Sequence, residues 1–289
     1  MGRNATTFTA QVQKLQSRGM ELDIPIPKVE EFLSDIGYYR LGFYWNPFEK
    51  NSKHEFIAGT KISDVIALYY LDVDLRSLLH RYLNRIEINF RTKLIYYASN
   101  KYVNSPVWFA DKKHIKPSFV IGFDKVYNEK FKNDNKPIRK HHDKYINDKY
   151  APAWKTLEYL TFGANFKIYR SLLDNNLKTE IASKFGIKNI KVFENYFNNI
   201  IHIRNVCSHG GILFDLKLPK GFRVIPLIDF ANGDRHSIYT AIKVILFVLE
   251  SISINRKGDL NSSINALFKK HENNPVIKNI IQSSIGYTF

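Results

Sequence analysis

The chain has 289 residues, of which 44% are hydrophobic and 14% aromatic, so it can bury a substantial core and is not expected to be disordered. Its formal net charge of +16 attracts polyanions over long distances, which makes nucleic acid the leading class of partner. The longest apolar run, Val244 to Leu249, is far too short to cross a bilayer, so no membrane partner is expected.

The predicted elements are almost all helices, beginning at residues 7–18 and 27–36. A long helix is predicted from Ile62 to Tyr97, because apolar residues recur there at helical spacing without an intervening Pro or Gly. Further helices are predicted at 118–132, 153–174, 177–185, 189–209, 235–254 and 260–271, with a last one after Pro275. Short extended segments are predicted at 55–57 and 222–228, where Gly and Pro punctuate the chain. Since no internal repeat is visible, the sequence favours one all-α domain over residues 1–289.

A strongly basic insertion lies at about residues 112–150. Between residues 112 and 144 there are ten Lys or Arg against four Asp or Glu. A charge run is often only a solvated face, but the charge of the whole chain favours a role in RNA binding. The candidate RNA-binding cations are Arg40, Arg139, Lys140 and Lys144.

Neither a metal nor a cofactor is expected. Cys207 is the only cysteine, which excludes an intrachain disulfide and a four-thiolate metal site. The adjacent His141 and His142 lack a Cys or a spaced carboxylate partner, so we expect surface residues there rather than metal ligands. The first residues lack the apolar core of a secretory signal, and together with the single cysteine this favours a cytoplasmic location.

Residues 192–209 form a strongly amphipathic helix when they are plotted at about 100° per residue. One stripe is polar and contains Glu194, Asn195, Asn198, His202, Asn205 and His209. The opposite side is apolar and contains Val192, Phe193, Tyr196, Phe197, Ile200, Ile203 and Cys207. Gly210 and Gly211 provide a C-terminal stop for this helix.

Arg204 points to the apolar side of that helix, where a guanidinium must leave the core, be paired, or lie at a partly buried interface. One interpretation is a structural ion pair with Glu87 of the long helix. On a straight helix Arg204 and His209 are separated by about 140° and about 7.5 Å. They can meet at one phosphate only if the helix ends near His209 or if a second copy of the chain supplies part of the site.

An arginine and a histidine are the two groups that a metal-free ribonuclease needs. The 2′-hydroxyl of RNA attacks the adjacent phosphorus while histidine acts as general base or acid. Arginine stabilises the charge on the phosphoryl oxygens. Products would carry a 2′,3′-cyclic phosphate and a 5′-hydroxyl, and DNA would survive because it lacks the 2′-hydroxyl.

The spacing of Arg204 and His209 resembles the RxxxxH signature of the HEPN superfamily of helical ribonucleases. The segment Tyr38 to Phe48, YYRLGFYWNPF, is similar to the YRLSGYWYPF box of the Abi-like proteins, the AbiD and AbiF group of bacterial phage-defence factors. Arg85 to Thr92 resembles the central EIxxRT helix of that family, and residues 152–163 resemble its PxWxxxExLSFG segment. The four segments occur in the order of the family, within about residues 35–215.

The resemblance implies an HEPN-type helical bundle with additional helices, a homodimer, and a toxin-like endoribonuclease role in abortive infection. In the AbiF branch it also implies control by a small non-coding RNA that acts as antitoxin. It assigns Arg204, Asn205 and His209 to the catalytic motif. The candidate supporting residues are His202, Glu87 and Arg91.

Two functions remain open at this point. One is a metal-independent endoribonuclease with a composite dimeric site, and the other is a non-catalytic protein that holds a specific small RNA. A third interpretation, a helical partner of a nucleotidyltransferase, has no supporting residue in this chain. A set of neighbouring aromatic residues either packs in the core, which is favoured, or stacks on unpaired bases: Tyr38, Tyr39, Tyr44 and Trp45.

Overall fold

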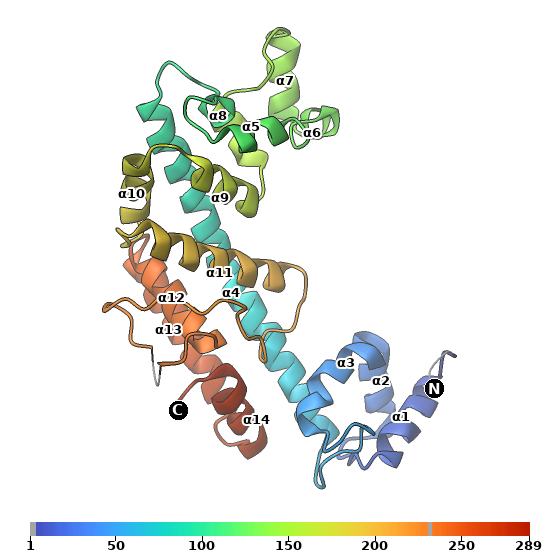
Figure 1. Ribbon diagram of the computed structural model, residues 1–289. Helices are drawn as coiled ribbons and strands as arrows, with labels where there is room; N and C mark the ends of the chain where they lie inside the picture. The colour runs from blue at the N-terminus through green and yellow to red at the C-terminus, as the bar shows by residue number, and fades with distance from the viewer. Residues whose placement is uncertain (1–3, 231–232) are drawn as a thin grey trace. The chain divides into compact units, whose positions relative to one another are not determined.

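The computed structural model describes residues 4–230 and 233–289, which form helices joined by loops (Figure 1). The described residues contain isolated β-bridges but no β-strand, which confirms the all-α prediction. The chain divides into two compact units. Unit 1 contains Met1–Leu78, Cys207–Leu216 and Ser262–Phe289, and unit 2 contains Leu79–Val206 and Lys217–Asn261. Nothing in this division tests the single-domain expectation, which stays a prediction.

Unit 1 is built from both ends of the chain. Its helices are α1 (Phe8–Ser17), α2 (Ile26–Ile36), α3 (Tyr38–Trp45), the first part of α4 (Ile62–Lys101), the end of α13 (Ile254–Lys269) and α14 (Pro275–Ile280). Gly37 ends α2 with φ of 91°, a conformation that favours glycine, and α3 starts at the next residue. The amide of Asn274 donates to Asp64 of α4 at 2.7 Å, so the cap of α14 is tied to the long helix. In the part of the chain that the structure describes, no helix is both long and apolar enough to span a membrane.

Unit 2 has an aromatic core around Phe90 of α4. Its other helices are α5 (Pro117–Phe123), α6 (Glu129–Asp134), α7 (Lys136–Lys144), α8 (Ala153–Thr156), α9 (Phe162–Ser171), α10 (Asn175–Ser183), α11 (Ile190–Ser208), α12 (Ile238–Glu250) and the start of α13. Six rings lie between 5.2 and 6.3 Å from the Phe90 ring, centroid to centroid: Phe162, Phe166, Tyr169, Phe185, Phe193 and Phe197. This cluster fixes α9 and α11 against the second half of α4, because aromatic rings supply a large buried apolar area.

Two of the predicted helices are interrupted in the structure. The prediction of one helix over 118–132 is wrong, since α5 ends at Phe123 and α6 starts after Asn128, whose side chain caps the new helix at Phe131 N. The prediction over 153–174 is also wrong, because the chain is extended at Leu160 between α8 and α9. The buried amide of Asn165 donates to the Leu157 and Leu160 carbonyls at that break. A side chain that satisfies the backbone thus replaces the continuous helix.

The predicted extended segments do not form strands. Phe56 makes only an isolated bridge with Glu49. Residues 222–228 run beside α11, where Asn195 bonds to the Gly221 carbonyl and the Arg223 amide, and where Tyr196 donates to the Arg223 carbonyl. Because side chains of α11 pair with this backbone, it needs no partner strand. Helices α3 and α7 were not predicted, since short helices carry little periodicity.

Candidate functional site

Helix α11 (Figure 1) carries Arg204 and Asn205 and ends at Ser208, one residue before His209. Its predicted apolar side is confirmed for six residues, which are buried: Val192, Phe193, Tyr196, Phe197, Ile200 and Ile203. The predicted polar stripe is divided. Asn198, Asn205 and His209 are exposed, whereas Glu194 and Asn195 are partly buried and hold neighbouring elements. The exposed part of the stripe therefore includes the end of the helix, where the motif lies.

Arg204 forms the ion pair with Glu87 that the sequence offered as one interpretation. Its Nε lies 2.9 Å from Glu87 Oε2, and its Nη1 donates to Asn205 Oδ1 at 3.4 Å. The Arg204 side chain stays 27% exposed, whereas the Glu87 carboxylate is buried. A buried carboxylate therefore sets the direction of a guanidinium that still reaches solvent.

Glu87 is shared by two arginines. Its second oxygen, Oε1, lies 3.2 Å from Arg91 Nη2, one turn further along α4. Arg91 also contacts Glu158 at 3.2 Å and donates to the Leu160 carbonyl at 3.4 Å. The two predicted supporting residues on α4 thus form one charged chain with Arg204 inside unit 2.

His209 is exposed and belongs to unit 1, together with the turn that follows it. Gly210 has φ of 65°, the left-handed conformation that commonly ends a helix. Arg40 Nη2 donates to the Gly210 carbonyl at 2.5 Å, and Arg76 Nη1 donates to the Gly211 carbonyl at 3.0 Å. Two cations thus bind carbonyls at the negative end of the helix dipole, beside the histidine.

A buried aspartate, Asp72 of α4, holds the rest of the same turn. It accepts hydrogen bonds from the amides of Leu213 and Phe214 at 3.0 and 2.7 Å, and from the Tyr44 hydroxyl at 2.8 Å. Arg76 pairs with the same carboxylate. Burial and the neighbouring Asp72 charge raise the pKa of Tyr44 to about 12, so its hydroxyl keeps the proton that it donates.

The sequence alone does not predict this network. Asp72 and Arg76 lie four residues apart on the predicted long helix, which is the spacing of an ordinary surface ion pair. The signal that could have drawn attention to them is their place in a stretch of α4 with buried apolar neighbours. Apart from Tyr44, their partners follow more than 130 residues later, so local sequence does not indicate them.

His202, a candidate supporting residue, is partly buried on α11. Its Nε2 has no hydrogen-bond partner among the described residues. Burial raises the pKa of the Cys207 thiol to about 12. The thiolate is the nucleophilic form, so this cysteine is not activated.

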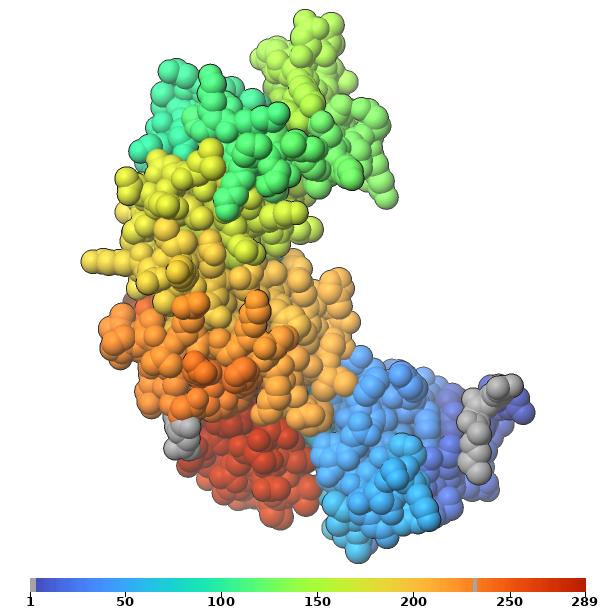
Figure 2. Space-filling model, in the orientation of Figure 1, coloured from blue at the N-terminus to red at the C-terminus, as the bar shows by residue number. Residues whose placement is uncertain are grey.

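The candidate RNA-binding cations fall into two groups. Arg139, Lys140 and Lys144 are exposed on α7, which projects with α6 from the other helices of unit 2 (Figures 1 and 2). Arg40 lies in unit 1 and is bound to the turn after His209. The structure therefore gathers three of the four cations on one short helix.

The expectation that both neighbouring histidines of α7 lie at the surface is wrong. His141 is only 4% exposed, because it shares the inner face of α7 with Ile138. Its Nε2 lies 2.9 Å from Asp148, and His142 Nε2 lies 2.8 Å from the Tyr127 hydroxyl. Among the described residues, no group of three or more His, Cys, Asp or Glu side chains is placed to hold a metal ion.

Comparison with known families gives one match, to the family described as Abi-like protein, over residues 31–215. The matched region includes α3, all of α4 and α11, and the turn after His209. No curated protein and no solved structure matches the chain. Because the matched region covers more than half of the 289 residues, this chain belongs to the Abi-like protein family.

Proposed function

We propose that this chain is a metal-independent endoribonuclease of HEPN type that acts in abortive infection. Membership of the Abi-like family suggests a role in phage defence. The observation that best supports catalysis is the way the motif residues are held. A buried carboxylate orients Arg204, while His209 stays exposed next to a turn whose carbonyls are bound by Arg40 and Arg76.

In the proposed reaction, His209 takes the proton from the 2′-hydroxyl, or returns one to the leaving 5′-oxygen. The guanidinium of Arg204 stabilises the negative charge that develops on the phosphoryl oxygens. Asn205 lies beside Arg204, accepts one of its hydrogen bonds and is itself exposed, so it would help to position the phosphate. Helix α11 ends at Ser208, so the straight-helix divergence of Arg204 and His209 does not apply at His209, and we propose that a dimer brings a second copy of the motif into the same site.

The test compares wild-type protein with His209→Ala on mixed cellular RNA in the presence of EDTA. His209 is exposed, so its removal should change the free energy of unfolding by no more than about 0.5 kcal/mol. Wild type should yield 2′,3′-cyclic phosphate and 5′-hydroxyl ends, and His209→Ala should yield none. A folded wild-type protein that leaves all RNA intact would contradict the proposal.

A second candidate function is the binding of a small non-coding RNA, which the exposed cations of α7 favour. A bound RNA of this kind would act as the antitoxin of the nuclease. Replacing Arg139, Lys140 and Lys144 with Gln should weaken the dependence of RNA affinity on salt. The slope of log affinity against log salt concentration should become less steep by about 0.7 for each phosphate contact with single-stranded RNA that is lost. If His209→Ala protein binds RNA tightly while wild type never cleaves any RNA, binding alone is the function.

A further inference from the structure

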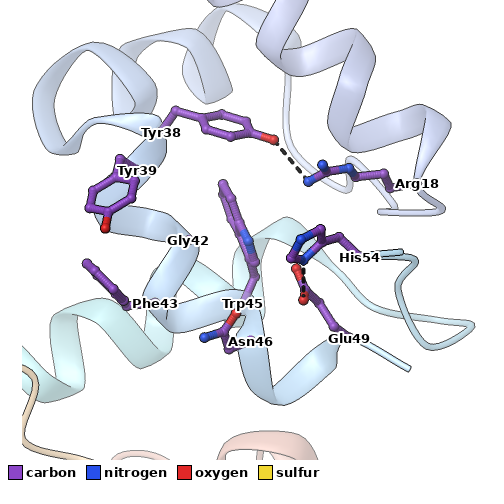
Figure 3. Close-up of a pocket in the computed structure, with 9 residues that line it drawn as sticks. All are labelled: Arg18, Tyr38, Tyr39, Gly42, Phe43, Trp45, Asn46, Glu49 and His54. Atoms are coloured by element: carbon purple, nitrogen blue, oxygen red, sulfur yellow. Dashed lines mark hydrogen bonds and ion pairs between the residues drawn. The ribbon is translucent and has the colours of Figure 1, made fainter. Parts of the chain in front are cut away.

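Helix α3 has two faces with different surroundings in unit 1. Arg40 and Tyr44 lie on the face that holds the turn after His209, through the Gly210 carbonyl and through Asp72. At about 100° per residue the remaining positions turn the other way. Except for the buried Leu41, they line a pocket of about 300 Å³ together with the residue that follows α1 and with residues after α3: Arg18, Tyr38, Tyr39, Gly42, Phe43, Trp45, Asn46, Glu49 and His54 (Figure 3).

The walls of this pocket are aromatic. Tyr38 and Trp45 make an edge contact with ring centroids 4.9 Å apart, and Tyr39 and Phe43 make another at 5.2 Å. Gly42 lies between Trp45 and the Tyr39–Phe43 pair, and it has no side chain to fill the space (Figure 3). Tyr39 is 81% exposed, so its ring is accessible to a ligand. Flat walls with an open side suit a flat ligand.

The remaining lining groups are charged or polar and are held in place. Arg18 donates to the Tyr38 hydroxyl at 3.2 Å, and His54 Nδ1 lies 2.8 Å from Glu49 Oε2. His54 has φ of 62° and ends a turn in which its amide donates to the Asn51 carbonyl at 3.1 Å. Lys14 lies near the same wall, with its Nζ 5.7 Å from the centre of the Tyr38 ring.

We propose that this pocket binds one unpaired nucleobase of an RNA strand. The base would stack on Tyr39, the exposed ring of the pocket, and Arg18 and Lys14 would approach the adjoining phosphate. Glu49 would accept a hydrogen bond from an amino group of the base, which adenine, cytosine and guanine have and uracil lacks. The size of the pocket, at the lower end for binding sites, favours a single base. This assignment rests on the proposed RNA substrate, and it gives α3 a role in selecting it.

The pocket offers two blocking substitutions with matched controls. A Cβ at Gly42 would lie 3.6 Å from the Trp45 ring, an ordinary contact, so Gly42→Ala should be tolerated while Gly42→Leu fills the space. Tyr39→Ala removes an exposed ring, and Tyr96→Ala on α4 removes another exposed ring outside the pocket. Thermal unfolding of each variant checks that it is folded, and Tyr39→Ala decides the question alone if Gly42→Leu does not fold.

The experiment measures the affinity of full-length His209→Ala protein for fluorescent RNA oligomers, with each substitution added to this background. Tyr39→Ala and Gly42→Leu should weaken binding of single-stranded oligomers of A or C by roughly tenfold, and the two controls by less than about twofold. Oligomers of U should bind more weakly than those of A or C, and a fully paired duplex should be insensitive to both pocket variants. Because every protein in this assay carries His209→Ala, the measured affinity reports on the pocket whether or not wild type cleaves RNA.

Unchanged binding of single strands in both pocket variants, or no binding of single strands at all, would overturn the proposal. Equal affinity for U, A and C would contradict the role of Glu49. If nucleoside monophosphates compete with the oligomer at equal concentration, the ligand of the pocket is a free nucleotide and not an RNA strand. If wild-type protein cleaves RNA and the pocket variants that keep His209 cleave it equally well, the nuclease proposal holds and the pocket proposal fails.

Discussion

Single residues differ in how firmly the structure holds them. Arg204 is fixed through Nε by a carboxylate that it shares with Arg91, whereas His209 has an exposed side chain on a fixed backbone. The proposed chemistry assigns different tasks to them. A charge-stabilising group must be oriented in advance, and a proton-transfer group must reach the substrate.

Glu87→Gln should destabilise the fold by about 1.5–3 kcal/mol, because it removes the carboxylate charge that accepts hydrogen bonds from two arginines. Glu158→Gln is the matched control, since Glu158 also pairs with Arg91 but is 49% exposed, and its loss should cost at most about 1 kcal/mol. Denaturant unfolding measures both values. Similar free energies of unfolding for the two variants would show that the buried pair has no special importance.

Cys207 gives a prediction for pH. In the unfolded chain a thiol ionises near pH 8.5, whereas the folded thiol keeps its proton until about 12. Its contribution to stability is therefore constant below about pH 8 and is lost as pH rises from there toward 12. Native protein should react with iodoacetamide at pH 8 far more slowly than protein in denaturant. Equal rates would show that the thiol is not buried.

At the level of elements, α11 carries Arg204 and Asn205, and the turn after it carries the backbone next to His209. The turn exists because Gly210 adopts a left-handed conformation and because Arg40, Arg76 and Asp72 bind its backbone. These contacts give a structural role to the α3 segment, which resembles the YRLSGYWYPF box of the family. Arg40 and Tyr44 of α3 act on the backbone that follows the histidine.

Gly210→Ala should destabilise the protein by about 1–2 kcal/mol, because an alanine at φ of 65° is strained. It should also lower the rate of RNA cleavage, since the backbone next to His209 must shift. Gly258→Ala is the control, and it should change the free energy of unfolding in the opposite direction. Gly258 lies inside α13 with nothing near an added Cβ, so alanine there should stabilise by about 0.5–1 kcal/mol. Thermal unfolding and a cleavage assay on both variants test the two signs.

At the scale of the whole molecule, the net charge and the proposed dimer are the two features that affect the proposed function most. The net charge of +16 would draw RNA to the protein at long range, and the dimer would decide where Arg204 and His209 meet. Both motif residues belong to one chain segment of six residues, yet they fall in different compact units. A site completed by a second copy predicts complementation between two inactive variants.

Mixing Arg204→Ala protein with His209→Ala protein, after exchange of subunits, should restore about one quarter of wild-type cleavage. Half of the dimers would be mixed, and one of the two sites in each would have both residues intact. Each variant alone should remain inactive. Inactivity of the mixture, with subunit exchange confirmed by differently labelled chains, would place Arg204 and His209 of one site in the same chain.

The sequence by itself determined the features that depend on local periodicity. The long helix α4, the helix α11 with its buried side, and the stop at Gly210 follow from apolar spacing and from the conformational freedom of glycine. It also offered the pairing of Arg204 with Glu87, because an arginine on an apolar side needs a partner.

Only the tertiary structure decided how the motif is held. Asp72 meets Leu213 and Phe214 across about 140 residues, and Arg40 meets Gly210 across 170. The tertiary structure also determines that His141 is buried, that the predicted helix over 118–132 is interrupted, and that a pocket forms on α3. Helical spacing reports which residues share a face within a few turns, but which distant backbone group completes a buried charge depends on the packing of the whole unit.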